Sequence, residues 1–366
     1  METISNNIPE VTVKDAVSQL KTLYVKAIEL GVDFKALPTP FLWGPAGVGK
    51  SQGVFQLAES MEEETSKSVV VTDVRLLLFS PVDLRGIPVA DESRQFSNWL
   101  LPSVFKMNED KNTVNILFLD ELSAAPQSVQ AAAYQICLDR KVGEHKLPEN
   151  CIVIAAGNRT TDMSLSYKMP KALCNRLMHF CIRSDFGAWK EWAIKNNIDG
   201  RIISYLAFDN SRLCTAPNSS DLAYPTPRSW SFVNTLLKTT AAKPHEIHHL
   251  IAATIGVDAA VEFESWCKMF YKLPSIDDIF KGQCLNYPKS YDVYYALVVS
   301  LTSAVISRRE GITAQELENV CTYAERFPAD FAVTFFRELN AVEELKPKLM
   351  KCEALNRWLI KNKKSL

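Results

Sequence analysis

The first apolar pattern along the chain has the spacing of a helix. Between residues 13 and 30, apolar side chains recur three and four positions apart, at Ala16, Val17, Leu20, Leu23, Tyr24, Ala27 and Ile28. This spacing places them on one face of an α-helix, and Gly31 follows as a residue that readily ends a helix. The sequence therefore predicts an N-terminal helix with one buried face.

A different pattern begins near Pro40 and continues to about Arg183. Short apolar runs, rich in β-branched residues, alternate there with stretches of helical spacing such as Gly49–Met61 and Pro126–Leu138. The runs interpreted as strands are Phe41–Trp43, Ser68–Val74, Val114–Leu119, Cys151–Ala155 and Met178–Ile182. Alternation of strands and helices favours a parallel sheet with helices on both faces.

The strand pattern mostly stops after Ser184–Gly187. Residues 188–265 have the spacing of several helices, interrupted by a polar loop at 215–227. After a second break at 272–289, which contains proline and glycine, residues 291–364 are again helical in pattern. We therefore expect an α/β core followed by two all-helical parts.

Composition narrows the classes of protein that fit. The chain has 41 Lys+Arg and 42 Asp+Glu, a net charge of -1, so no overall field attracts nucleic acid or anionic lipid. Nine cysteines form no CxxC pair, which is typical of free thiols in a reducing compartment. The first ten residues lack the pattern of a signal peptide, and the longest uncharged apolar stretch is shorter than the roughly 20 residues of a membrane helix. We expect a soluble, cytoplasmic protein with no nucleic-acid or membrane partner.

The strongest motif is a glycine-rich loop between a short strand and a helix. It reads Gly44-Pro45-Ala46-Gly47-Val48-Gly49-Lys50-Ser51 and fits the phosphate-loop pattern G-x-x-x-x-G-K-[ST] without deviation. Backbone N–H groups of such a loop surround phosphate, aided by the positive end of the helix. Lys50 would contact the β- and γ-phosphates, and the Ser51 hydroxyl would bind Mg²⁺. The predicted nucleotide-binding residues are these eight and Gln52, which follows them.

The second motif is an apolar run that ends in two acids, Asp120 and Glu121. A buried strand of a parallel sheet exposes functional groups mainly at its carboxyl end, where ligands bind in open α/β folds. Asp120 would hold Mg²⁺ together with Ser51, and Glu121 would polarise the attacking water. Such a run is weak evidence alone, but it gains specificity about 70 residues after a complete phosphate loop.

A third apolar run, Ile152–Ala156, is followed by Gly157 and Asn158. A strand here would place Asn158 beside the γ-phosphate. A neutral amide can donate to phosphate and can also orient water without repelling it. The alternative is an ordinary asparagine turn at a strand end.

Together these residues resemble an AAA+ ATPase, and further segments resemble its MoxR branch. Residues 73–88 are similar to the segment that carries a helix-2 insert in that branch, and residues 141–150 to the hairpin before its sensor strand. Pro227-Arg228-Ser229-Trp230 resembles the start of the second-sensor helix. The resemblance covers about residues 35–265. For the last hundred residues, the prediction of helices depends on their apolar spacing alone.

This resemblance implies a fold, a reaction and an assembly. The fold would be α/β, an AAA+ P-loop core with a five-stranded parallel sheet in the order 5-1-4-3-2, an all-α lid and an all-α C-terminal extension. The reaction would be hydrolysis of ATP with Mg²⁺, in a ring, expected to be a hexamer, that remodels or activates a protein client. A partner with a von Willebrand factor A domain is also implied. The expected divisions are an N-terminal helix packed on the core (1–34), the core (35–185), the lid with the second sensor (186–271) and the C-terminal extension (272–366).

The resemblance also assigns roles to two arginines. Arg176 matches the arginine finger, which contacts the ATP of a neighbouring subunit. Its neighbours Asn175 and Leu177 depart from the acid and phenylalanine of many relatives, so Arg159 and Arg183 remain competitors. Arg228 matches the second-sensor arginine that contacts the γ-phosphate from the lid.

Two other readings of the sequence remain open. A slow nucleotide-gated binding module would share the same motifs, although an intact Glu121 argues against it. His245-Glu246-Ile247-His248-His249 fits the zinc-peptidase pattern H-E-x-x-H, but Pro244 predicts that a helix begins here and no third ligand is marked. The aromatic residues Phe96, Trp99 and Phe105 line a central pore, contact a client or belong to the core.

Overall fold

The computed structural model divides into two compact units. The first contains Met1–Asp185 with Ala216–Ser219, and the second contains Phe186–Thr215 with Ser220–Leu366. The structure describes residues 8–159, 162, 167, 169, 171–218, 220–270, 273–288 and 290–362.

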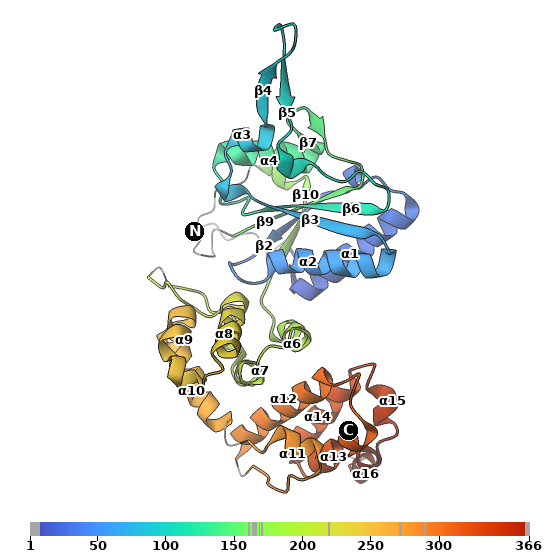
Figure 1. Ribbon diagram of the computed structural model, residues 1–366, viewed down its shortest axis with the longest axis vertical. Coiled ribbons are helices and arrows are strands. Elements are labelled where there is room, and N and C mark those ends of the chain that lie inside the picture. The colour runs from blue at the N-terminus through green and yellow to red at the C-terminus, as the bar shows by residue number, and fades with distance from the viewer. Residues whose placement is uncertain are drawn as a thin grey trace. The chain divides into compact units, whose positions relative to one another are not determined.

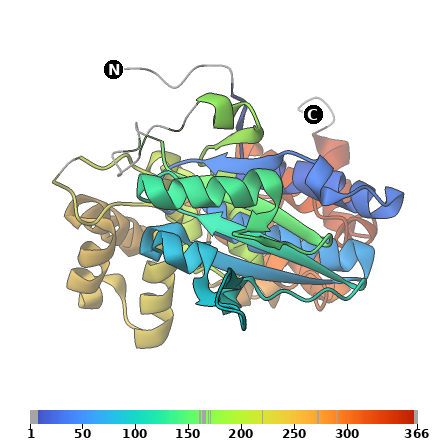
Figure 2. The same cartoon turned by 90° about the horizontal axis from the view of Figure 1, so that it is seen from above.

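The first unit is built on a parallel sheet of six strands (Figures 1 and 2). In chain order these are β1 (Glu10–Val11), β2 (Thr39–Trp43), β3 (Ser68–Arg75), β6 (Thr113–Asp120), β9 (Cys151–Gly157) and β10 (Leu177–Ile182). Their order across the sheet is β1-β10-β2-β9-β6-β3. The five longer strands confirm the predicted order 5-1-4-3-2. The predicted count of five strands misses β1, which is the outermost strand beside β10. It pairs with β10 because Cys181 N–H and Arg183 N–H donate to the carbonyl oxygens of Pro9 and Val11.

Helices cover both faces of this sheet, which explains why its central strands are mostly apolar (Figure 1). Every residue of β6 and β9 is buried. Alternate side chains of β6 enter different cores: Ile116 and Phe118 pack with α1 (Val13–Leu30) and α2 (Lys50–Thr65), whereas Leu117 and Leu119 pack with α4 (Gln127–Asp139).

The predicted N-terminal helix is confirmed as α1. Thr12 begins it with a capping box, in which its hydroxyl accepts from Asp15 N–H and the Asp15 carboxylate accepts from Thr12. Gly31 ends it in the left-handed conformation, with a φ of 65°. The helix packs along α2, and its buried residues Ala16, Leu20 and Tyr24 belong to the core on that face of the sheet.

The first unit also contains α3 (Pro81–Arg85) and two antiparallel hairpins that are not part of the six-stranded sheet. They are β4 (Ile87–Ala90) with β5 (Ser97–Leu100), and β7 (Lys141–Val142) with β8 (His145–Lys146). The β4–β5 hairpin projects away from the sheet (Figure 1). A ring nitrogen of His145 lies 2.6 Å from the Trp99 carbonyl oxygen and joins the two hairpins. Phe105 is buried in the core, whereas Phe96 at the hairpin is 71% exposed.

The second unit is all-helical, as predicted, and has two cores. The first group of helices is α6 (Phe186–Lys195), α7 (Gly200–Phe208), α8 (Pro227–Thr240), α9 (His248–Ile255) and α10 (Val257–Phe270). The second is α11 (Ile276–Phe280), α12 (Tyr291–Ser307), α13 (Ala314–Ala324), α14 (Ala329–Asn340), α15 (Lys346–Leu349) and α16 (Glu353–Lys361). Helix α12 contributes to both cores, because Ala296 and Val299 pack with the first group while Leu297 and Leu301 pack with the second.

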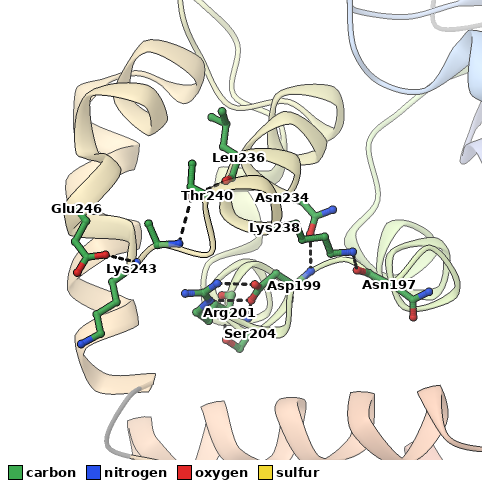
Figure 3. Close-up of polar contacts among 11 residues, drawn as sticks. Asn197, Asp199, Arg201, Ser204, Asn234, Leu236, Lys238, Thr240, Lys243 and Glu246 are labelled. Carbon is green, nitrogen blue, oxygen red and sulfur yellow. Dashed lines mark hydrogen bonds and ion pairs between the residues drawn. The ribbon is translucent and has the colours of Figure 1, made fainter.

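A polar network fixes the start of α7 (Figure 3). Asp199 caps this helix by accepting from Arg201 N–H at 2.9 Å, and its carboxylate also accepts from the Arg201 guanidinium at 2.9 and 2.7 Å. The Asp199 N–H donates to the side-chain oxygen of Asn234 on α8. Burial alone raises the pKa of the Asp199 carboxyl, but the hydrogen bonds and charge of Arg201 outweigh it, and the net pKa is lowered.

Replacing Asp199 with asparagine should therefore destabilise the second unit by about 1–3 kcal/mol, because the Arg201 guanidinium loses its negative partner, although asparagine can still cap α7. The lowered pKa means that this stabilisation is complete above the ordinary aspartate pKa and is lost as the pH falls through the lower folded pKa. Denaturant titrations between pH 7 and pH 3 would measure both effects. Asp258→Asn, which alters an exposed aspartate of α10, is the control and should change stability much less. Equal effects of the two variants would contradict the role of Asp199.

Candidate active site

The glycine-rich loop joins β2 to α2 at the carboxyl edge of the sheet. Gly47 and Gly49 have φ angles of 77° and 108°, in the left-handed region that disfavours other residues. A Cβ on Gly44 would lie 2.9 Å from the carbonyl oxygen of Ile182, so this position also excludes a side chain. Gly49 offers no side-chain cap, which leaves the first N–H groups of α2 directed toward the loop as donors for an anion.

Lys50 is held beside this loop and is only 8% exposed. Its ammonium group donates to the carbonyl oxygens of Gly44 and Pro45 at 2.6 and 3.0 Å. It also donates to Oδ1 of Asn158 at 2.8 Å. These contacts hold the charge of the Lys50 ammonium group beside the loop.

The side chain of Ser51 meets the acidic end of β6. Its hydroxyl donates to Oδ2 of Asp120 at 2.9 Å, and Asp120 is buried. A hydroxyl and a carboxylate at this distance are the oxygen ligands that Mg²⁺ takes from proteins, so the residues present fit that ion. The exposed Gln52 follows on the first turn of α2.

Glu121 directly follows β6 and has a φ of 58°, which is unusual for a residue with a side chain. Its N–H donates to Oδ1 of Asp120 at 2.8 Å, and this bond secures the turn. The Glu121 carboxylate accepts a hydrogen bond from Nδ2 of Asn158 at 3.1 Å. The amide of Asn158 therefore joins Lys50 on one side to Glu121 on the other.

Ser123 positions Asn158, a role that the sequence did not reveal. Its hydroxyl accepts from Asn158 N–H at 2.8 Å and donates to the Asn158 carbonyl oxygen at 3.0 Å. A Cβ on Gly157 would lie 2.6 Å from the same hydroxyl, so this close approach requires glycine. The only sequence signal was a small hydroxyl residue two positions after Glu121.

Asp73 is a second residue that sequence reasoning missed. It lies on β3 beside the strand that ends in Asp120, with the register Asp73 to Phe118 and Arg75 to Asp120. Burial raises the pKa of the Asp73 carboxyl, and the charge of Asp120 raises it further. The available signal was a single acid near the carboxyl end of β3.

Arg176 lies at the amino-terminal end of β10, whereas the phosphate loop follows the carboxyl end of β2. It is exposed in the turn directly before β10, where Leu177 pairs with Thr39 at the start of β2. The phosphate loop begins after Trp43, which pairs with Cys181. At about 3.3 Å per residue, Arg176 is roughly 15 Å along the strand direction from the loop of its own chain.

The competing arginines are engaged locally. Arg159 contacts Asp162 through both its main chain and its guanidinium, at 2.8–3.1 Å. Arg183 forms a 3.4 Å ion pair with Asp185. Arg228 lies in the second unit, exposed in the first turn of α8, which begins with a Thr226 capping box.

The histidine-rich motif does not lie on one continuous α-helix. His245 and Glu246 are in a 3₁₀ turn over Pro244–Ile247, and α9 starts at His248. His248, rather than the two motif histidines, contacts a carboxylate, that of Glu264 at 2.5 Å. Among the residues that the structure describes, no three His, Cys, Asp or Glu side chains are arranged to hold a metal ion.

Strand order, phosphate loop and the acidic end of β6 together define a parallel α/β fold of the P-loop type. No family model and no curated protein matches the chain. Among solved structures it is similar to a RuvB mutant of Thermotoga maritima, at 16% identity, 86% coverage of this chain, 92% of that chain and a TM-score of 0.38. It is also similar to NtrX of Brucella abortus in complex with ATP, at 12% identity, 93% coverage of this chain, 69% of that chain and a TM-score of 0.37. A third similar structure is the E. coli MS115-1 HORMA:CdnC:Trip13 complex, at 14% identity, 70% coverage of this chain, 88% of that chain and a TM-score of 0.38.

Similarities at this level add nothing to what the strand order already defines. Within the described residues, no helix is long and apolar enough to cross a membrane.

Proposed function

We propose that this protein hydrolyses ATP with Mg²⁺. The observation that carries the proposal is the convergence of Lys50, Ser51, Asp120, Glu121 and Asn158 at the carboxyl edge of one sheet. The loop and the first turn of α2 would bind the phosphates. Ser51 and Asp120 would hold Mg²⁺, which neutralises charge on the phosphate oxygens when bound.

Each remaining side chain has a distinct part in the reaction. Lys50 would exchange its bonds to backbone carbonyls for the β- and γ-phosphates. Glu121 would orient the attacking water and accept its proton, because its carboxylate contacts the same Asn158 amide that contacts Lys50 of the phosphate loop. Asn158 would contact the γ-phosphate or the water, since its amide already lies between Lys50 and Glu121.

The position of Arg176 favours a ring. An arginine roughly 15 Å along the strands from its own phosphate loop cannot serve that loop, but it can serve the loop of a neighbouring copy. We therefore propose a closed oligomer of the MoxR type, a hexamer by resemblance, with Arg176 as the finger in trans and Arg228 as the second sensor. The local ion pairs of Arg159 and Arg183 support Arg176 over these competitors.

The β4–β5 hairpin supports a role in remodelling a protein client. Its apolar side chains are exposed rather than packed: Ile87 is 61%, Phe96 71% and Leu100 58% exposed. A protruding apolar hairpin on a nucleotide-driven ring can contact a polypeptide, in keeping with chaperone-like action. A partner carrying a von Willebrand factor A domain remains part of this proposal by resemblance alone.

One contact favours a second candidate function, a nucleotide-gated module with slow turnover. The hydrogen bond from Asn158 holds the Glu121 carboxylate, and water activation requires that this carboxylate turn toward the γ-phosphate. A state that retains the bond would bind ATP and hydrolyse it slowly. Turnover measured with and without a partner protein separates the two candidates, because a switch remains slow in both.

Lys50→Ala tests the proposed site directly. The variant should bind ATP on the order of 100-fold more weakly, because a charged hydrogen bond contributes about 1.5–3 kcal/mol. Isothermal titration with Mg-ATP measures this loss. Lys106→Ala, which removes an exposed lysine of the same unit, is the control and should bind like the wild type. Unchanged affinity of Lys50→Ala would mean that the loop is not the phosphate site.

A further inference from the structure

The side chain of His179 joins two segments of the first unit that are far apart in the sequence. His179 lies on β10, and its ring lies beside that of Trp43, the last residue of β2, with ring centres 6.1 Å apart and planes inclined by 28°. Nδ1 of His179 is 2.9 Å from Nε1 of Trp43, and Nε2 is 2.8 Å from the carbonyl oxygen of Cys174. The imidazole ring therefore bridges the end of β2 and the chain that leads into β10.

The two partners fix the state of this ring. The indole N–H of Trp43 can only donate, so Nδ1 of His179 must accept and carry no proton. The carbonyl oxygen of Cys174 can only accept, so Nε2 must carry a proton and donate it. A neutral imidazole with its proton on Nε2 meets both demands at once.

One end of the bridge reaches the phosphate loop. Trp43 is followed by Gly44, whose N–H donates to the carbonyl oxygen of Gly157 at 3.2 Å and whose own carbonyl oxygen accepts from the Lys50 ammonium group at 2.6 Å. A phosphate that draws the ammonium group of Lys50 toward itself releases this last bond. The main chain beside Trp43 thus responds directly to a nucleotide in the loop.

The other end of the bridge reaches the turn that carries Arg176. Cys174 ends α5 (Lys171–Cys174), and the exposed Asn175 and Arg176 follow it directly before β10. The hydrogen bond from His179 therefore holds the main chain two residues before Arg176. A shift of the imidazole ring would move the base of the turn from which the arginine side chain extends.

We propose that His179 is a positioning residue, which couples the nucleotide in a subunit's own phosphate loop to the Arg176 that the same subunit offers to its neighbour. This inference rests on the proposed function, because Arg176 has a target only in a ring that hydrolyses ATP. His179 acts through Trp43 on one side and through the Arg176 turn on the other. Its replacement should leave ATP binding intact and lower turnover at the neighbouring site.

Two substitutions divide the bridge. Asparagine at position 179 can accept from the Trp43 indole but is too short to reach the Cys174 carbonyl, whereas glutamine can donate to that carbonyl but gives up the Trp43 contact. Each variant should bind Mg-ATP like the wild type and lose turnover on the order of fivefold, the weight of one neutral hydrogen bond. His245→Asn, which alters an exposed histidine, is the control and should keep full turnover.

A double substitution tests whether the two ends act as one unit. Trp43→Phe keeps an aromatic ring beside His179 but removes the N–H, so it should lower turnover by a similar factor. Added to His179→Gln, which already lacks this contact, Trp43→Phe should cause almost no further loss. Losses that multiply would show that the two side chains act separately and would contradict the bridge.

Mixed rings isolate the effect on the neighbouring site. Glu121→Gln subunits lack the proposed base but can offer an intact Arg176 to Arg176→Ala subunits, whose own phosphate loop and His179 are unchanged. Placing His179→Asn in the Glu121→Gln subunits alone should lower the restored activity on the order of fivefold. A purely structural role of His179 within its own site would not change this activity, because the hydrolysing subunits carry no substitution at position 179.

The outcomes separate this inference from the proposed function. Restored activity that is undiminished by His179→Asn would overturn the coupling. A mixture that restores nothing even with His179 intact would remove Arg176 from its role in trans, which belongs to the proposed function. The bridge is then tested by the rate at which N-ethylmaleimide modifies the half-buried Cys174, with Cys284 as the reference thiol. A slowly hydrolysed ATP analogue should change this rate in the wild type and not in His179→Asn, and an equal response of the two proteins would overturn the coupling independently.

Discussion

Replacing Glu121 with glutamine should reduce ATP turnover by on the order of 10²–10⁴-fold while leaving ATP affinity nearly unchanged. Glutamine has almost the same shape and can still accept the hydrogen bond from Nδ2 of Asn158. The bond between Ser51 and Asp120, which would hold Mg²⁺, is also untouched. The variant loses only the carboxylate that accepts a proton from water, so binding and hydrolysis should separate.

Phosphate release at saturating Mg-ATP, paired with a binding titration, measures both quantities. Glu59→Gln, on the exposed face of α2 in the same unit, provides a control of the same chemistry and should retain wild-type turnover. Wild-type turnover of Glu121→Gln itself would remove Glu121 from the mechanism. If the variant does hold ATP, it is also suited to capture a client, and a client that it retains with ATP should not be retained by Lys50→Ala.

Arg176→Ala should bind ATP almost normally and lose turnover by on the order of 10³-fold, if it acts as a strong arginine finger. The reason is its position at the amino-terminal ends of the strands, away from the phosphate loop at their carboxyl ends. Removing Arg176 therefore leaves the binding site of its own chain intact. Arg183→Ala is the matched control, because Arg183 is a half-exposed arginine just beyond the other end of β10. Greater loss in Arg183→Ala than in Arg176→Ala would reverse the assignment.

Mixing the two inactive variants distinguishes action in trans from action in cis. Arg176→Ala subunits retain Lys50 and Glu121, while Glu121→Gln subunits retain Arg176. In a mixed ring, some sites combine an intact base from one subunit with an intact finger from the next, so part of the activity should return. Activity that stays absent in rings shown to contain both variants would mean that Arg176 does not act on a neighbouring site.

The sequence was most informative where chemistry is local. The phosphate loop is readable because its glycines, Lys50 and Ser51 lie within eight consecutive residues. The central strands β6 and β9 are readable because burial on both faces makes them mostly apolar. By contrast, β1 has two residues, too few to show any period, and pairs with β10 only through backbone groups.

Contacts that depend on strand register were not readable. Asp73 and Asp120 lie close to each other because of the register in which β3 pairs with β6. No spacing in the sequence indicates that register. The same holds for Ser123, whose hydroxyl reaches the strand end at Asn158.

Helix α12 has a mechanical consequence for the second unit. Its opposite sides are buried in two different cores, through Ala296 and Val299 on one side and Leu297 and Leu301 on the other. The helix therefore joins the two groups of helices through packed side chains along its length and not through a flexible linker. The helices on either side cannot swing freely about it without opening a close-packed core. Any nucleotide-driven rotation of α6–α10 would therefore carry α11–α16 along as a rigid lever, and a small angle at one end would become a larger displacement at the other.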